Sequence, residues 1–318
     1  LLIVSYAYYL SFGVKTAFFI LYTTCTTYIG ARIIGFFISD NKKKSIELNA
    51  SISQYDKKES RKQLKIKKRI VVIAVLILNF GMLAIVKYGT FFIENINSLL
   101  RVTGNTNQIN VWTILLPVGI SFYTFQSMSY MIDVYQEKYE PEKNIFKFAL
   151  FVSFFPQIMQ GPIGRFNKLA AQLFDNHKFD LTRLEYALQL VGWGLFKKIV
   201  LADRAAVFVN QVFDNYIDYY GFSVIFAVLL YCIQLYADFS GGMDIVIGTA
   251  SMFGIELDEN FRQPFFSKSI SEFWRRWHIT LGTWMKDYVF YPFSLSKAMS
   301  KFSKFLKKHC NQYIGKTL

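Results

Sequence analysis

The most constraining feature of this chain is a series of long apolar runs that few charges interrupt. Thr16–Ile38, Ile70–Val86 and Gly221–Tyr236 together contain one charged residue, Arg32. About 20 apolar residues are enough for a helix to cross the hydrocarbon core of a membrane. Charged residues make up only 18% of the chain, against about 25% in ordinary soluble domains. The sequence therefore predicts an all-α, polytopic transmembrane protein and excludes a disordered chain or a soluble α/β enzyme.

Several runs are interrupted in ways that predict broken helices. Pro117 and Gly119 fall in the middle of one apolar run, and Gln160–Arg165, which contains two glycines and a proline, cannot continue a regular helix. Met243–Ile255 is too short to span and predicts a re-entrant or interfacial segment. Such breaks survive in membranes only where protein or a water-filled cavity covers the freed backbone. We expect four or five full spans together with tilted, broken and re-entrant helices.

One hydrophilic segment, Asn41–Arg69, carries more than half of the chain's net charge. It contains eleven Lys and Arg residues against three acidic residues, a net charge of +8 out of +14. The loop expected at Glu94–Asn110 has a single basic residue, Arg101. The positive-inside rule places residues 41–69 in the cytoplasm as a basic loop and residues 94–110 outside. Contact with anionic lipid is the expected role, because no nucleic-acid-binding module accompanies the charge.

The rest of the chain indicates one domain. We find no internal repeat and no low-complexity segment, so residues 1–318 are predicted to form a single integral-membrane domain. The chain begins inside an apolar run, Leu1–Val4, without a methionine, and it ends at Leu318 in a basic stretch. We therefore expect it to be incomplete at both ends. The three cysteines, Cys25, Cys232 and Cys310, have no CxxC spacing, so neither a metal site nor a disulfide is expected.

Polar side chains at membrane depth are costly and mark candidate sites. The first cluster contains Gln160 and Pro162 and is either a tight interhelical turn or the lining of a site. The second, Tyr236–Asp244, places Asp238 directly after an apolar run and before two glycines. Asp238 is expected to cap a following helix rather than to take part in catalysis.

The third cluster, Glu272–Tyr288, contains the best candidate for chemistry. On one continuous helix, a single arc of about 100° would hold Trp274, Trp277, Leu281, Trp284, Met285 and Tyr288. His278 would lie at the edge of that arc, with Arg275 on the adjoining face. Burial and nearby cations both lower the pKa of a histidine and favour the neutral form that can act as a base. A packed, hydrogen-bonded histidine is the alternative. The other histidines, His177 and His309, have polar neighbours, and no HExxH, GxSxG or Walker A motif is present.

Together these stretches resemble the membrane-bound O-acyltransferases. The similarity is to the bacterial branch that includes alginate O-acetylase and the D-alanyl transfer protein of teichoic acids. The stretches that carry it occur in family order, at Leu116–Gln126, Phe155–Arg165, Gly192–Lys198, Tyr236–Asp244 and Glu272–Asp287. A series of motifs in order is more specific than any one of them.

The resemblance implies a ring of tilted helices around a funnel through the membrane. A thioester donor, acetyl-CoA or an acyl carrier protein, would enter from the cytoplasm, and an acceptor hydroxyl would approach from outside. His278 would be the histidine of the family's Trp-His segment and a catalytic residue, one of the family's two functional histidines. The other, usually taken as the principal catalytic residue, would lie downstream of Leu318, outside this chain. The residues expected to shape the substrate tunnel are Gln160, Pro162, Asp238, Arg275, Trp277 and Asp287. No metal and no tightly bound cofactor are implied.

The expected function is therefore transfer of an acyl group, most simply acetyl, to a hydroxyl of an extracytoplasmic polysaccharide or cell-wall polymer. The protein would span the plasma membrane several times, with an acyl donor or carrier protein as its cytoplasmic partner. Outside, the acceptor polymer would be reached directly or through an extracytoplasmic acetyltransferase. One alternative is D-alanyl transfer to teichoic acid. Another, from a different class, is a non-catalytic transporter or flippase whose broken helices bind a substrate.

Overall fold

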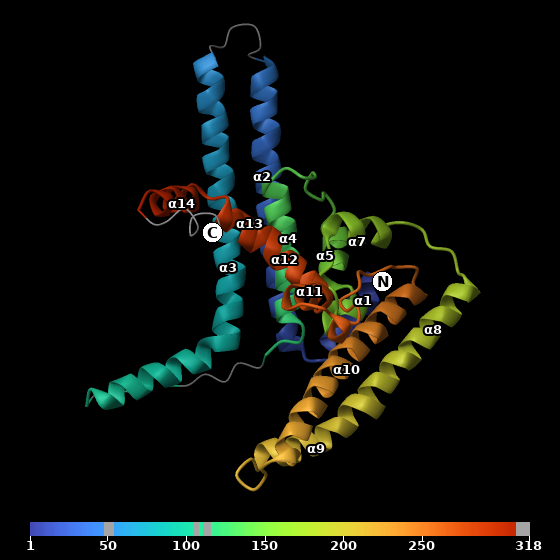
Figure 1. The fold of residues 1–318 in the computed structure, drawn as a ribbon. Coiled ribbons are helices and arrows are strands. Elements are labelled where there is room, and N and C mark those ends of the chain that lie inside the picture. Colours follow the sequence, from blue (N-terminus) through green and yellow to red (C-terminus); the bar gives the residue numbers. More distant parts are fainter. Residues whose placement is uncertain (48–53, 105–107, 111–115, 310–318) are drawn as a thin grey trace. The chain divides into compact units, whose positions relative to one another are not determined.

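The computed structural model describes residues 1–47, 54–104, 108–110 and 116–309, and most of these residues are helical (Figure 1). The only β pairing among them is an isolated bridge between Phe261 and Trp277. The all-α prediction is confirmed. The chain forms two compact units, Leu1–Leu257 and Asp258–Leu318.

The first unit contains ten α-helices and one π-helical turn among its described residues. In chain order they are α1 (Leu2–Leu10), α2 (Val14–Glu47), α3 (Gln54–Val102), α4 (Ile120–Tyr135), α5 (Ile145–Ser153), α6 (Phe155–Ile158), α7 (Phe166–Leu173), α8 (Leu181–Leu195), the π-helical η1 (Phe196–Ala202), α9 (Asp203–Asp214) and α10 (Phe222–Met252). The described part of the second unit is built from shorter elements. They are the 3₁₀ turn η2 (Pro264–Phe266), α11 (Ile270–Arg276), α12 (Ile279–Met285), the π-helical η3 (Lys286–Phe290), α13 (Tyr291–Ser294) and α14 (Lys297–His309).

Three helices in the described parts of the chain are long and apolar enough to cross a membrane. They lie at Val14–Lys44, Lys58–Val102 and Phe222–Met252, fewer than the four or five spans expected. Large apolar side chains on these helices are exposed, among them Phe36, Ile77 and Leu229. Exposed apolar side chains along a membrane-length helix are what a lipid environment requires.

The two segments predicted as loops beside these helices are largely helical where they are described. Residues 41–47 continue α2 and residues 54–69 belong to α3, which form an antiparallel pair (Figure 1). Residues 48–53 lie outside the described part of the chain. Likewise α3 continues through Glu94 to Val102, so the predicted loop at 94–110 begins later. Lys and Arg have high helix propensity, so a strongly basic segment does not by itself end a helix.

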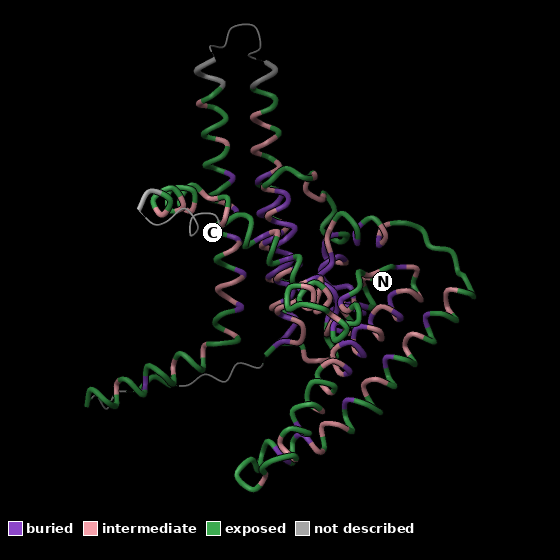
Figure 2. Tube along the Cα trace, viewed as in Figure 1, coloured by how far each residue is buried: buried purple, intermediate pink, exposed green. Residues whose placement is uncertain are grey.

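Buried aromatic rings hold α2, α4, α5 and α7 together. Tyr130 lies 4.7 Å from Phe148 and 4.6 Å from Phe166 between ring centroids. Tyr130 and Phe148 are fully buried, as is Tyr123, about two turns earlier in α4. Figure 2 shows buried positions where these helices meet and fewer of them toward the ends of α2 and α3 that lead into residues 48–53. The core thus fixes the α4–α5 region against α2.

The breaks predicted at Pro117–Gly119 and after Met159 are both present. Gly119 has a φ of 71° and precedes the first residue of α4, while residues 111–115 lie outside the described part of the chain. Gly161–Arg165 is not helical. A left-handed residue at a helix start favours glycine, which explains why the helix begins where it does.

The break predicted in the Tyr236–Asp244 stretch is absent, because α10 continues through both glycines to Met252. Met243–Ile255 is therefore not a separate re-entrant segment but mostly the C-terminal part of α10. The glycines serve helix packing instead. A Cβ atom at Gly241 would lie 2.8 Å from the carbonyl oxygen of Gly194 on α8, so the two backbones touch where no side chain intervenes.

Candidate functional site

The seven predicted site residues fall into two groups. Gln160, Pro162 and Asp238 belong to the first compact unit, and Arg275, Trp277, His278 and Asp287 belong to the second.

The Trp277–His278 pair forms a break between two helices rather than part of one. α11 ends at Arg276, Trp277 is extended (φ −103°, ψ 127°), and α12 begins at Ile279. The prediction of one continuous helix with a single aromatic face is therefore wrong. Trp274 is 62% exposed whereas Trp284 is 3% exposed, so the aromatic side chains do not share one surface.

The preceding segment, Asn260–Arg262, causes this break by pairing with it. The Arg262 amide donates to the Arg276 carbonyl, and the Ile279 amide donates to the Asn260 carbonyl, both at 3.0 Å. Between these two bonds lies the bridge of Phe261 with Trp277. These backbone groups replace the helical hydrogen bonds that the chain would otherwise make around Trp277 and His278.

Asn260 also caps α12 through its side chain. Its Oδ1 atom accepts hydrogen bonds from the Thr280 amide at 3.0 Å and from the Thr280 hydroxyl at 2.6 Å. Asn260 is 1% exposed. The side chain at the N-cap position normally supplies such a bond. In α12 the N-cap residue is His278, and Asn260 supplies the bond instead. Sequence reasoning missed Asn260, since a cap supplied from 20 residues away leaves no local pattern.

We expect Asn260→Ala to destabilise the Trp277–His278 turn. Loss of a helix cap costs about 1 kcal/mol, and leaving buried Thr280 groups without an acceptor adds about 1–3 kcal/mol. Thermal unfolding of the purified protein in detergent should occur at a clearly lower temperature. Asn260→Asp keeps both acceptor bonds, so its unfolding temperature should fall less than that of Asn260→Ala. Equal unfolding temperatures for Asn260→Ala and the wild type would contradict the capping role.

His278 occupies a strained backbone position at the start of α12. It has a φ of 46° and a ψ of 53°, in the left-handed region, and its carbonyl accepts the Gly282 amide at 3.1 Å. Residues other than glycine adopt this region rarely, and where they do the surrounding structure must hold them there. The side chain is half-buried. His278 lies outside the three long apolar helices, and burial lowers its pKa to about 4.

The Trp277 ring is fixed by neighbouring rings on both sides. It stacks on Phe273 at 5.5 Å with an interplanar angle of 16°, and it meets Phe261 edge to face at 5.0 Å. This aromatic cluster holds the residue next to His278 in place. Arg275 is exposed in the last turn of α11, and Asp287 belongs to the π-helical turn η3. Their part in a substrate tunnel stays a prediction.

In the first unit, the Gln160–Pro162 segment is a tightly packed turn. Pro162 is buried, and Gln160 lies against α10, where a Cβ atom on Gly242 would come within 2.8 Å of the Gln160 Oε1 atom. Beneath the turn, Gln157 donates to the Gln126 side chain at 2.9 Å, and Gln126 donates to the Phe151 carbonyl at 2.6 Å. These two buried amides, which sequence reasoning did not single out, tie α4, α5 and the turn together.

Asp238 does not cap a helix, because it lies inside α10 and its carboxylate pairs with a lysine. Lys198 lies 2.6 Å from Asp238 and 3.1 Å from Asp203. The adjacent Lys197 lies 2.5 Å from Asp244 and donates to the Ser240 hydroxyl at 3.1 Å. Both lysines belong to η1, and π-helical turns within α-helices are frequent at functional sites. The result is a network of charges between η1 and α10 in which each lysine has a carboxylate partner.

Comparison with known proteins places the sequence in a family. The model of the membrane-bound O-acyltransferase family matches residues 142–307, a range that contains all seven predicted site residues. The chain belongs to this family and is a membrane protein.

Named relatives act on different polymers. A probable alginate O-acetylase of Pseudomonas syringae is 40% identical over 214 residues, covering 67% of this chain and 41% of the relative. A peptidoglycan O-acetyltransferase of Helicobacter pylori is 34% identical over 251 residues, covering 71% of this chain and 47% of the relative. A teichoic acid D-alanyltransferase of Bacillus subtilis is 30% identical over 203 residues, covering 59% of this chain and 48% of the relative. The chain thus spans less than half the length of these relatives.

Proposed function

We propose that this protein is an O-acyltransferase that moves an acetyl group from a thioester to a hydroxyl of an extracytoplasmic polysaccharide or cell-wall polymer. The observation that carries the proposal is His278. It is a half-buried imidazole with a pKa lowered to about 4, in a rigidly held turn within the family-matched range. Such a group is neutral near pH 7 and has a lone pair available to accept a proton.

The reaction follows from that protonation state. The neutral imidazole accepts the proton of the acceptor hydroxyl while the oxygen forms a bond to the thioester carbonyl carbon. The carbon–sulfur bond then breaks, and the imidazolium returns its proton to the leaving thiolate. The products are an ester and a free thiol, and the histidine is regenerated. Restriction of water near the reacting groups would limit hydrolysis of the thioester.

The acyl group is proposed to be acetyl rather than D-alanyl. The two acetyltransferases described above are 40% and 34% identical to this chain, whereas the D-alanyltransferase is 30% identical. The donor would be acetyl-CoA or an acyl carrier protein that approaches from the cytoplasm, where the basic ends of α2 and α3 would lie in a multi-pass plasma-membrane topology. The donor acts as a substrate, with no tightly bound cofactor.

The proposal is tested with membrane vesicles that contain the full-length protein. Vesicles supplied with ¹⁴C-acetyl-CoA, or with a ¹⁴C-acetylated carrier protein, should transfer label to polysaccharide as an alkali-labile ester. D-[¹⁴C]alanine on a carrier protein should give less than a tenth of that transfer. Greater transfer of D-alanine than of acetyl would identify D-alanine as the acyl group. Movement of polymer or lipid-linked sugar across the vesicle without any acyl transfer would favour a transporter and refute the enzyme.

A further inference from the structure

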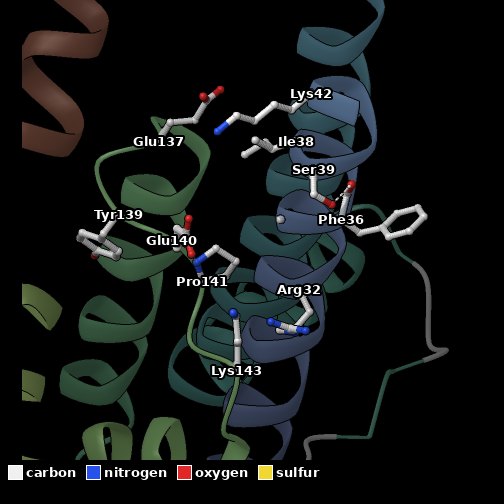
Figure 3. Close-up of a pocket in the computed structure, with 11 residues that line it drawn as sticks. Arg32, Phe36, Ile38, Ser39, Lys42, Glu137, Tyr139, Glu140, Pro141 and Lys143 are labelled. Carbon is white, nitrogen blue, oxygen red and sulfur yellow. Dashed lines mark hydrogen bonds between the residues drawn. The ribbon is translucent and has the colours of Figure 1, made fainter. Parts of the chain in front are cut away.

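A second candidate site lies in the first unit, in a cavity of about 540 Å³ between α2 and the connector that joins α4 to α5. Arg32, Gly35 and Lys42 line it from α2 (Figure 3). The connector contributes Glu137, Tyr139, Glu140, Pro141 and Lys143. None of the seven predicted site residues is among its lining residues.

Packing and hydrogen bonds fix the shape of this cavity. A Cβ atom on Gly35 would lie 2.5 Å from Pro141 Cγ, so the connector rests directly on α2. The Tyr28 hydroxyl of α2 donates to the Lys143 carbonyl at 2.6 Å. The Glu142 carboxylate accepts the amides of Lys143 and Asn144 at 2.8 and 2.9 Å. The backbone of Lys143 is therefore held at a defined place opposite α2.

Cations outnumber available carboxylates around the cavity. Arg32, Lys42 and Lys143 line it, together with the carboxylates of Glu137 and Glu140. Glu137 already forms an ion pair with Lys68 of α3. Within the described part of the chain, neither the Arg32 guanidinium nor the Lys143 ammonium has an ion-pair partner. Figure 3 shows these two groups on facing walls below Pro141, while Lys42 extends toward Glu137. Two facing cations without a carboxylate between them favour an anion.

The surroundings of the cavity indicate what carries the anion. Arg32 lies twelve residues before the end of the apolar helix Val14–Lys44 and nine residues before the strongly basic segment that begins at Asn41. Phe36, one turn further along α2, lines the cavity and is 65% exposed. The cavity therefore joins a cationic wall to an apolar surface at the end of a membrane-length helix. Phospholipids combine an anionic phosphate with apolar chains, and basic side chains at this depth attract them.

We propose that Arg32 and Lys143 bind the phosphate group of an anionic phospholipid. Arg32 can donate two parallel hydrogen bonds to phosphate oxygens, and Lys143 supplies a second charge from the opposite wall. Phe36 contacts the acyl chains outside the cavity. This site would anchor the α4–α5 connector to the membrane surface, and it does not depend on the proposed acyl transfer.

The test compares two double variants that remove equal charge from the full-length protein. Arg32→Gln/Lys143→Gln removes the facing cations. Lys15→Gln/Lys178→Gln removes two exposed cations that lie outside both the cavity and the basic segment Asn41–Arg69. Each protein is purified in detergent, and native mass spectrometry measures binding of phosphatidylglycerol and of zwitterionic phosphatidylcholine. A parallel series titrates inorganic phosphate against bound phosphatidylglycerol.

We expect phosphatidylglycerol to bind the wild type at one site and at least tenfold more weakly to Arg32→Gln/Lys143→Gln. Lys15→Gln/Lys178→Gln should bind like the wild type, and the swapped variant Arg32→Lys/Lys143→Arg, which keeps both charges, should bind more tightly than Arg32→Gln/Lys143→Gln. Displacement of lipid only by other anionic lipids identifies the headgroup as the ligand. Displacement by millimolar inorganic phosphate keeps the phosphate site but assigns it to the free ion. Equal weakening in both glutamine variants, unchanged binding in Arg32→Gln/Lys143→Gln, or equal binding of phosphatidylcholine would overturn the proposal.

Discussion

Replacing His278 by asparagine is expected to lower the rate of acyl transfer by about 100-fold or more, the usual loss when a general base is removed. Asparagine adopts left-handed backbone angles more readily than most residues, so the φ of 46° at this position can be kept. The side chain loses its basic nitrogen while the turn remains. Transfer of ¹⁴C-acetyl label in vesicles measures the rate, and detergent-extracted protein that elutes as a single peak shows that folding is preserved.

A second histidine supplies the matched control. His177 is exposed, and its Nε2 atom lies 2.6 Å from the Gln172 carbonyl in the first unit. His177→Asn should retain wild-type transfer within about twofold, since surface substitutions away from a site cost little. Wild-type activity in His278→Asn would remove His278 from the mechanism, whatever His177→Asn shows.

The pH profile of the wild type tests the same assignment without a mutation. Only the neutral imidazole accepts a proton, and burial lowers the pKa of His278 from 6.5 to about 4. Because protonation inactivates the base, lowering its pKa moves the loss of activity to lower pH. Initial rates should therefore stay level from pH 8 to about pH 5 and fall only below that. A rate that halves near pH 6.5 would mean that the base is a histidine of ordinary pKa.

Hydropathy predicted most of the fold, because lipid imposes a strict condition on each spanning helix. Membrane-length apolar runs identified α2, α3 and α10, and proline with left-handed glycine identified the start of α4. Where hydropathy failed, the reason was contact with another helix. The Gly241–Gly242 pair can break a helix or allow another helix to approach, and only the position of Gly194 on α8 decides between them. Charge likewise did not end α2 at Asn41, since the basic segment continues as helix.

The candidate site was predicted by residue and not by geometry. His278 could be chosen because the other two histidines have polar neighbours. Helical periodicity, however, placed it on one continuous helix, whereas it lies in the break between α11 and α12. The turn depends on Asn260, whose backbone and side chain reach Ile279 and Thr280 across 20 residues. Asp238 and Lys198 were both visible in the sequence. Nothing local shows that they pair, because the bond joins η1 to α10.

Gly119→Ala is expected to prevent the first unit from folding. Gly119 has a φ of 71°, where a Cβ atom costs about 1–2 kcal/mol. The larger effect is steric, since that Cβ atom would lie 1.7 Å from the carbonyl oxygen of Ile158. The clash involves backbone atoms of the α6 turn, which cannot rotate away as a flexible side chain would. Yield of detergent-soluble, monodisperse protein should fall at least tenfold.

Gly104→Ala is the control that separates backbone strain from steric clash. Gly104 also has a left-handed φ, of 77°, but no atom lies within 4 Å of the position its Cβ would take. The alanine variant should therefore show only the small conformational cost and give nearly wild-type yield. If both variants lose protein equally, backbone strain alone explains the effect. If neither does, α4 and the α6 turn are not in contact at Gly119, and Gln157 and Gln160 are not held by packing against that contact.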